Sequence, residues 1–127
     1  GGMQKRLEGA LRAGSAEFDS YLTKVVLEKI DIQASGNMLG MTRLIANGRL
    51  YNRGDRTLTG IELTAIAYNL ENKVAAQNTS QPIPNKRPEP LKPGESILVE
   101  TIVDLPANIR EGDIMDVKQS ISGLTFQ

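Results

Sequence analysis

The sequence of 127 residues contains no cysteine, no histidine and no tryptophan. Without cysteine, disulfides, thiolate nucleophiles and Cys-based zinc or iron–sulfur sites are excluded. Without histidine, the chain lacks the commonest general acid/base at neutral pH, so neither a Ser–His–Asp nor a Cys–His site can be assembled. Only carboxylates and lysines remain for catalysis. We therefore expect a chain that is not an enzyme and needs no cofactor.

Neither sign of charge is in excess, because 15 Lys and Arg residues balance 15 Asp and Glu residues. With no basic field and only three Tyr and two Phe, the chain has little with which to hold phosphates or stack bases, so no nucleic-acid partner is expected. No apolar run approaches the roughly 20 residues that span a bilayer, so we expect no membrane insertion by this chain itself. Its start at Gly1-Gly2 is compatible with a removed signal or anchor.

The first 20 residues predict a short helix or a disordered lead-in. Two glycines interrupt its apolar stripe, which comprises Leu7, Ala10 and Leu11 with Gly9 and Gly14 between and beyond them. A glycine in a helix interior costs about 1 kcal/mol relative to alanine, so such a helix is marginal. A solvated lead-in is favoured over one that lies on a membrane surface. The chain is thus divided into a lead-in at 1–20, which would follow a removed anchor, and one domain at 21–127.

From residue 21 the hydrophobic period is two, which is typical of β-strands. Strands are predicted at 21–33, 42–51, 57–70, 74–77, 96–105 and 113–127. In the first of them, Ile30 and Ile32 are expected to point inward. The third is a long central strand with one apolar face, made by Ile61, Leu63, Ala65 and Ala67. Short strands divided by turn signals predict an all-β, immunoglobulin-like antiparallel β-sandwich of about seven strands.

Glycines and a change of parity predict where strands pack closely, turn or bend. Gly48 within a strand indicates a packing position, whereas Asn52 and Gly54 supply a turn between strands. Around Ser122-Gly123 the parity of the apolar residues switches. This switch predicts a bulge by which the last strand changes sheets.

Prolines are concentrated in one segment, since five of the six lie between residues 82 and 93. Proline has no backbone N–H, so this segment is predicted to be an extended edge or a crossover. Pro93 and Gly94 suit the two central positions of a type II turn. Leu91, just before them, is predicted to anchor the loop in the core.

These turn and packing residues resemble the bacterial extracytoplasmic immunoglobulin-like domains of the FxLYD type and their uncharacterised relatives. The resemblance covers residues 21–127, and its structural motif comprises Gly48, Asn52, Gly54, Tyr68, Leu91, Pro93 and Gly94. It implies an exported domain without enzyme activity. It also implies a location in the periplasm or at the cell surface, tethered by an N-terminal anchor that is absent from this chain.

Two groups of like charge are candidate sites. Glu111, Asp113 and Asp116 offer oxygen ligands for calcium but lack the spacing and the glycine of a calcium loop, so a solvated acidic turn is favoured and no metal is predicted. The second group contains Lys86, Arg87 and Lys92. It is interpreted as a solvated loop that, with the prolines, protects a sheet edge from aggregation.

The sequence therefore favours a non-enzymatic interaction or spacer module of a bacterial cell-envelope protein. An unknown protein partner is expected to contact a sheet edge or the end loops. The alternative is an accessory binding subdomain of a larger enzyme or transporter whose active part lies outside this chain. A stand-alone enzyme built on carboxylates and lysines is the least favoured interpretation, and the oligomeric state is left open.

Overall fold

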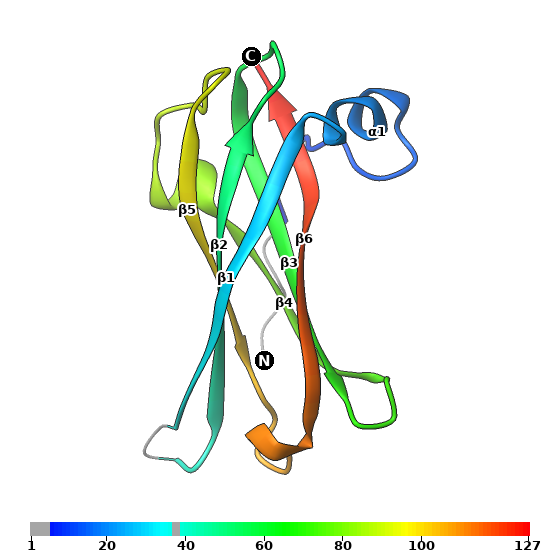
Figure 1. Cartoon of the computed structure of the whole chain (residues 1–127), viewed down its shortest axis with the longest axis vertical. Helices are drawn as coiled ribbons and strands as arrows, with labels where there is room; N and C mark the ends of the chain where they lie inside the picture. The colour runs from blue at the N-terminus through cyan, green and yellow to red at the C-terminus, as the bar shows by residue number, and fades with distance from the viewer. Residues whose placement is uncertain (1–5, 37–38) are drawn as a thin grey trace.

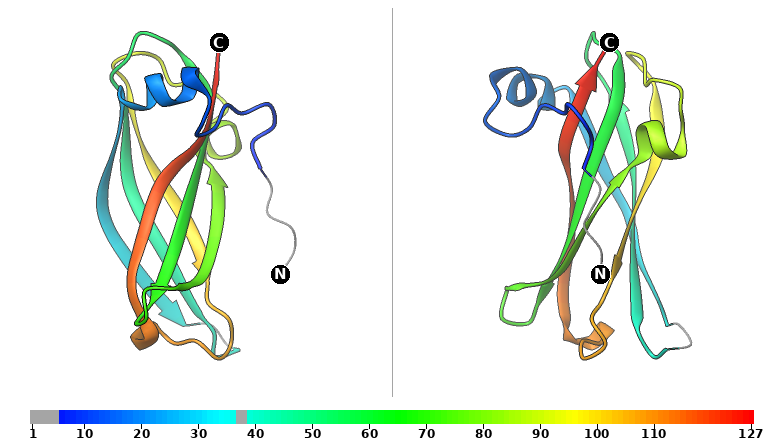
Figure 2. Two further views of the ribbon diagram at one scale, coloured as in Figure 1. Left: turned by 90° about the vertical axis from the view of Figure 1, so that its right-hand side faces the viewer. Right: turned by 180° about the vertical axis from the view of Figure 1, so that it is seen from behind.

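The computed structural model describes residues 6–36 and 39–127 and consists mostly of β-strands (Figure 1). Its elements are α1 (Ala16–Leu22), β1 (Val25–Gly36), β2 (Thr42–Asn52), β3 (Leu58–Asn69), β4 (Val74–Gln81), an irregular helical turn (Pro82–Lys86), β5 (Ser96–Asp104), a 3-10 turn (Glu111–Asp113) and β6 (Ile114–Phe126). Two antiparallel sheets, ordered β1-β2-β5 and β4-β3-β6, face each other (Figure 2). The predicted β-sandwich is confirmed.

The described residues form six strands rather than the predicted seven. The Pro-rich segment adds no strand, because after β4 it makes only isolated bridges to β3, between Ile83 and Ile61 and between Leu91 and Leu58. Proline cannot donate to a ladder, so a run of prolines prevents continuous pairing. The segment instead crosses from one sheet to the other, which is the second of the two structures predicted for it.

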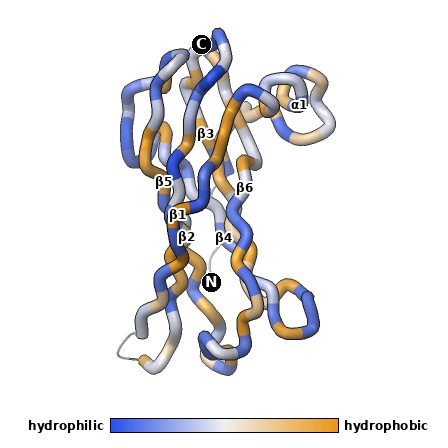
Figure 3. Tube along the Cα trace, viewed as in Figure 1, coloured by the Kyte–Doolittle hydropathy of each residue, from blue (hydrophilic) through white to orange (hydrophobic). Residues whose placement is uncertain are grey.

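The core lies between the two sheets and follows the alternation of the strands. Figure 3 shows hydrophobic and hydrophilic residues alternating along much of the sandwich. The predicted apolar face of β3 is confirmed, because all four of its residues are fully buried: Ile61, Leu63, Ala65 and Ala67. Buried residues of the opposite sheet pack against this face in two clusters: Leu50 and Val99 with Ile61 and Leu63, and Leu44, Ala46 and Val103 with Ala65 and Ala67.

The prediction that Ile30 points inward is wrong, since its side chain is 50% exposed. In the register of β1 with β2, Lys29 pairs with Gly48 and Asp31 pairs with Asn47, which leaves Ile30 unpaired in a β-bulge. A bulge inserts one residue and shifts the parity of the strand beyond it. Ile32 is half-buried and packs against the core.

The bulge predicted near Gly123 is confirmed, but its predicted role is wrong. Glu62 pairs with Gly123 and Leu63 pairs with Ile121, so Ser122 is the extra residue. β6 pairs with β3 on both sides of this bulge and therefore stays in one sheet. The bulge changes the direction of the Ser122 side chain instead of the sheet to which β6 belongs.

Residues 6–22, here called the N-terminal segment, pack on the sandwich rather than being solvated. Phe18 and Tyr21 of α1 are buried, as is Leu7. The backbones of Leu11 and Leu124 exchange two hydrogen bonds, of 2.9 and 3.1 Å. α1 begins after the N-cap Ser15 and ends at Leu22, so Tyr21 lies in the helix and not in the first strand. The division of the chain at residue 20 stays a prediction.

The loop before β5 contains the expected type II turn. Gly94 has φ +86°, and the N–H of Glu95 donates to the carbonyl of Lys92 over 3.1 Å. The N–H of Gly94 donates to the carbonyl of Asn52, which joins this turn to the end of β2. Leu91, where the sequence places an anchor, is fully buried.

Gly94→Ala is expected to lower the free energy of unfolding by about 1 kcal/mol, because a side chain disfavours left-handed backbone by roughly 1–2 kcal/mol per residue. Steric overlap is not the cause, since a Cβ atom at Gly94 would meet no atom within 4 Å. Gly112→Ala is the matched control, because Gly112 has the same open surroundings without a positive φ. Urea denaturation compares the two variants, and an equal effect in both would contradict the turn assignment.

Candidate functional site

The most unusual polar group of the fold is Glu62, in the middle of β3. Its side chain is fully buried, and no other charged residue among those described is buried to this degree. The parity of β3 places Glu62 on the outer face of the sheet, opposite the apolar face that fills the core. The N-terminal segment covers that face, and this covering is what buries the carboxylate.

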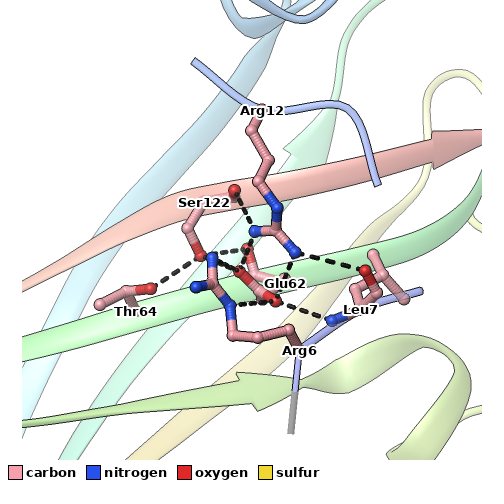
Figure 4. Close-up of polar contacts among 6 residues, drawn as sticks. All are labelled: Arg6, Leu7, Arg12, Glu62, Thr64 and Ser122. Atoms are coloured by element: carbon pink, nitrogen blue, oxygen red, sulfur yellow. Dashed lines mark hydrogen bonds and ion pairs between the residues drawn. The ribbon is translucent and has the colours of Figure 1, made fainter. Parts of the chain in front are cut away.

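Six hydrogen bonds converge on the Glu62 carboxylate, three on each oxygen (Figure 4). Arg6 donates from Nε (3.1 Å) and Nη2 (3.0 Å), and Arg12 donates from Nη1 (2.6 Å) and Nη2 (3.2 Å). The Leu7 N–H (2.8 Å) and the Ser122 hydroxyl (2.7 Å) complete the set. We call these five residues, Arg6, Leu7, Arg12, Glu62 and Ser122, the Glu62 cluster.

The strand features around Glu62 explain why the cluster forms there. Ser122 is the bulged residue of β6, and the bulge places its hydroxyl between Thr64, which donates to it over 2.7 Å, and Glu62. Gly123 lets the N-terminal segment approach, because a Cβ atom there would lie 3.1 Å from Cβ of Ala10 and 3.2 Å from Nη1 of Arg12. The bulge and the glycine together make room for the N-terminal segment to bring its two arginines to Glu62.

The electrostatics of the cluster keep Glu62 ionised. Burial alone would raise the pKa of the Glu62 carboxyl, but hydrogen bonds from the two arginines, the Leu7 N–H and Ser122 outweigh it and hold that pKa well below its ordinary range. A carboxylate with three donors on each oxygen has no lone pair left for a substrate or a metal ion. The arrangement is suited to holding the N-terminal segment rather than to chemistry.

The Glu62 cluster was not predicted from the sequence. The prediction for 57–70 named only the apolar face of the strand, and Arg6 and Arg12 lie within the segment for which a solvated lead-in was favoured. The separation of 50 residues between Arg12 and Glu62 gives no local pattern that joins them. The one available signal was the parity switch at Ser122-Gly123, which marks where the last strand bends beside Glu62.

A second buried polar group, Asn52, unites several residues of the predicted structural motif. Its Nδ2 donates to the carbonyls of Arg56 (2.8 Å) and Leu91 (3.0 Å). Its Oδ1 accepts from the Tyr21 hydroxyl (2.6 Å) and from the Gly54 N–H (3.2 Å). A side chain on Gly54 would overlap the Tyr21 ring. The motif residues Asn52, Gly54 and Leu91 therefore meet around one amide, which joins α1 to two loops.

The remaining motif residues lie elsewhere. Gly48 is in β2, where a Cβ atom would lie 3.0 Å from Oε1 of Gln119 and 3.2 Å from Cδ1 of Leu27. Tyr68 is near the end of β3, with the Lys118 ammonium 5.5 Å from its ring centre. Pro93 and Gly94 form the turn before β5 and are joined to Asn52 through the backbone bond already described. The motif thus supports loops and packing at several places and forms no single site.

Two of the three acidic residues considered for calcium act as local caps. Asp113 accepts from the Arg110 N–H over 2.9 Å, and Asp116 accepts from the Val117 N–H over 2.8 Å. Within the described residues, no group of three acidic side chains is placed to hold a metal ion. In the basic group, Arg87 donates to the carbonyls of Glu89 and Pro90 and thereby shapes its own loop.

Several clefts open on the surface of the sandwich. The first has a volume of about 730 Å³ beside the Pro-rich turn, where Gln81, Pro82, Asn85, Arg87, Leu98 and Glu100 contribute to its lining. The second, of about 350 Å³, lies between β1 and β6, and its lining includes Leu27, Lys29, Ile32, Asp116, Val117 and Gln119. Each of these two clefts has one carboxylate among its described lining residues, Glu100 or Asp116, whereas a smaller cleft of about 270 Å³ beside the 3-10 turn has two, Glu111 and Asp116. Glycoside hydrolysis ordinarily uses two carboxylates.

Two facing antiparallel sheets with this strand order define an immunoglobulin-like β-sandwich. No protein-family model matches the sequence, and no curated protein matches it. Among solved structures, the chain is similar to a beta-glucuronidase from glycoside hydrolase family 2, at 10% identity and a TM-score of 0.50. The similarity covers 74% of this chain and 11% of the beta-glucuronidase chain, and it concerns the fold alone. None of the helices in the described ranges has the length and apolar character needed to cross a membrane.

Proposed function

We propose that this domain is a non-enzymatic interaction or spacer module of a bacterial cell-envelope protein. The observation that carries the proposal is the Glu62 cluster. The one fully buried carboxylate among the described residues accepts hydrogen bonds from the N-terminal segment and from Ser122 of the adjacent bulge. A spacer needs such a joint, because the joint fixes the orientation of the domain relative to whatever precedes it.

The cell-envelope setting is supported by the resemblance to FxLYD-type domains, which we extend to this chain as part of the proposal. The motif residues that carry the resemblance stabilise the loops and turns at Asn52, Leu91 and Gly94. In the proposal, the module lies outside the cytoplasm, is tethered by an N-terminal anchor, and meets a protein partner through a sheet edge or its end loops.

The alternative function is an accessory subdomain of a larger enzyme or transporter. The observation that favours it is the match to 11% of a glycoside hydrolase chain, in which the fold makes up a small part of a large enzyme. That enzyme's activity supplies no role for any residue of this chain. The alternative requires a catalytic or transport domain in the same gene product.

Fractionation of cells that express the native full-length gene product tests the proposal. An antibody raised against residues 21–127 is expected to detect the protein in the membrane fraction, and protease added to spheroplasts is expected to degrade it. A cytoplasmic protein of the same cells, which the protease should spare, is the control. Recovery in the soluble cytoplasmic fraction, or a catalytic domain in the same polypeptide, would refute the spacer proposal.

A further inference from the structure

Along most of its length, β6 pairs with a described strand on one side only. β3 pairs with β6 along one side, and the sheet order β4-β3-β6 leaves the other side at the margin of the sheet. Seven-stranded immunoglobulin-like sandwiches carry a further strand in the corresponding place. In the described part of this chain, the position is filled only at Leu124, where the N-terminal segment exchanges its two backbone bonds.

The lower part of this edge, residues 114–120, offers backbone groups to a partner. The Val117 N–H bonds to the Asp116 carboxylate and not to β3, so the backbone groups of Val117 point away from β3. In an antiparallel ladder the backbone groups of alternate residues point to the same side, so those of Gln119 and Ile121 also point away from β3. The Val117 N–H is capped by the carboxylate of its neighbour Asp116, over 2.8 Å. Among the described residues no strand pairs with β6 along this side, and β1 of the opposite sheet faces it across a cleft of about 350 Å³ (Figure 2, left).

The charged residues on this edge match those of a second, identical strand that runs antiparallel to it. Asp116 and Lys118 flank Val117, and both lie on the outer face, since Val117 is buried. If two copies of the strand pair antiparallel with Val117 opposite Val117, each Asp116 lies opposite the Lys118 of the other copy. Directly opposite side chains in an antiparallel pair are close enough to interact. An unrelated strand would find the same backbone groups but not this charge match.

We propose that residues 114–120 of β6 pair antiparallel with the same residues of a second copy of this chain. The two sheets then join into one six-stranded sheet across a two-fold axis at Val117, which is a self-complementary interface. On pairing, the Val117 N–H donates to the partner's backbone, and the Asp116 carboxylate moves from that N–H to Lys118 of the second copy. This pairing specifies the partner in the proposed interaction role, and it rests on the proposed function only in that the partner contacts a sheet edge. The spacer role does not depend on it.

Analytical ultracentrifugation of the whole chain, from micromolar to millimolar concentration, tests the pairing. The wild type is expected to dimerise, and its dissociation constant is expected to rise with salt. Asp116→Lys and Lys118→Asp each place like charges opposite one another twice, so each variant alone is expected to dimerise at least about tenfold more weakly. An equimolar mixture of the two variants restores both opposite-charge pairs and is expected to dimerise about as well as the wild type.

Lys86→Asp is the matched control, because it makes the same charge change on the turn after β4, outside the clefts that residues 114–120 line, and is expected to leave the dissociation constant unchanged. Far-UV circular dichroism establishes that each variant is folded. The proposal fails if the wild type remains monomeric at every concentration, if the single reversals have no effect, or if the mixture is no stronger than its components. None of these outcomes bears on the membrane fractionation, so the proposed function fails or survives separately.

Discussion

Glu62→Gln is expected to lower the free energy of unfolding by about 3 kcal/mol, because breaking a buried ion pair by removing one partner costs roughly 3–5 kcal/mol. The lower end applies here, since Arg6 is 52% exposed and can be rehydrated. The substitution keeps the shape of the side chain but turns one acceptor oxygen into an NH2 group that faces arginine donors. Urea denaturation at neutral pH measures the loss.

The matched control for this variant is Glu100→Gln on β5, where the carboxylate is exposed. A surface change of this kind is expected to stay within about 0.5 kcal/mol. A nitroxide attached to a cysteine at Glu8 gives a second readout, because the chain has no cysteine of its own. The label is expected to gain mobility in the Glu62→Gln background and not in the Glu100→Gln background. Equal mobility in both would contradict the role of Glu62 in holding the N-terminal segment.

The effect of Glu62 also depends on pH, with a definite sign. The folded-state pKa of its carboxyl is lowered, whereas in the unfolded chain a glutamate titrates at about 4.3. The unfolded state therefore binds more protons in acid, so the stabilisation by Glu62 is complete above about pH 5 and declines as the pH falls below about 4. The difference between wild type and Glu62→Gln is expected to narrow from pH 7 to about pH 3. A difference that stays constant would contradict the lowered pKa.

The sequence predicted the parts of the fold that depend on neighbouring residues. The alternation from Ile61 to Ala67 defines a buried strand face, and Pro93-Gly94 defines a turn, because both patterns arise from backbone geometry over a few residues. The alternation did not predict the direction of the Ile30 side chain. The bulge at Ile30 adds one residue to β1 between Lys29 and Asp31, and because the strand was predicted with unbroken alternation, the direction of the Ile30 side chain was misassigned.

The candidate site was less predictable than the fold for a related reason. A glutamate on the outer face of a strand is ordinarily solvated, and only the covering of that face by the N-terminal segment makes Glu62 buried. The residues that cover it are some 50 positions away in sequence. Asn52 was identified as a turn residue, but its partners at Tyr21 and Leu91 are also distant, so its burial was not foreseen.

Asn52→Ala is expected to be as damaging as the change at Glu62, with a loss of about 3 kcal/mol. Four hydrogen bonds end on this one amide, each with a net contribution of about 1 kcal/mol, and buried groups left unpaired add a further cost. Asn47→Ala is the matched control on the same strand, because the Asn47 amide makes one exposed bond to Asp31. That variant is expected to lose less than about 1 kcal/mol.

Asn52→Asp tests the hydrogen bonds that the Asn52 amide donates separately from those that it accepts. The two side chains have the same shape, but an aspartate oxygen in place of Nδ2 would face the carbonyls of Arg56 and Leu91 without a proton to donate. The expected loss is therefore at least as large as that of Asn52→Ala at neutral pH, and it should decrease in acid as the new carboxyl is protonated. If Asn52→Asp were as stable as the wild type at pH 7, the two carbonyl contacts could not be what joins β2 to the loop that carries Leu91.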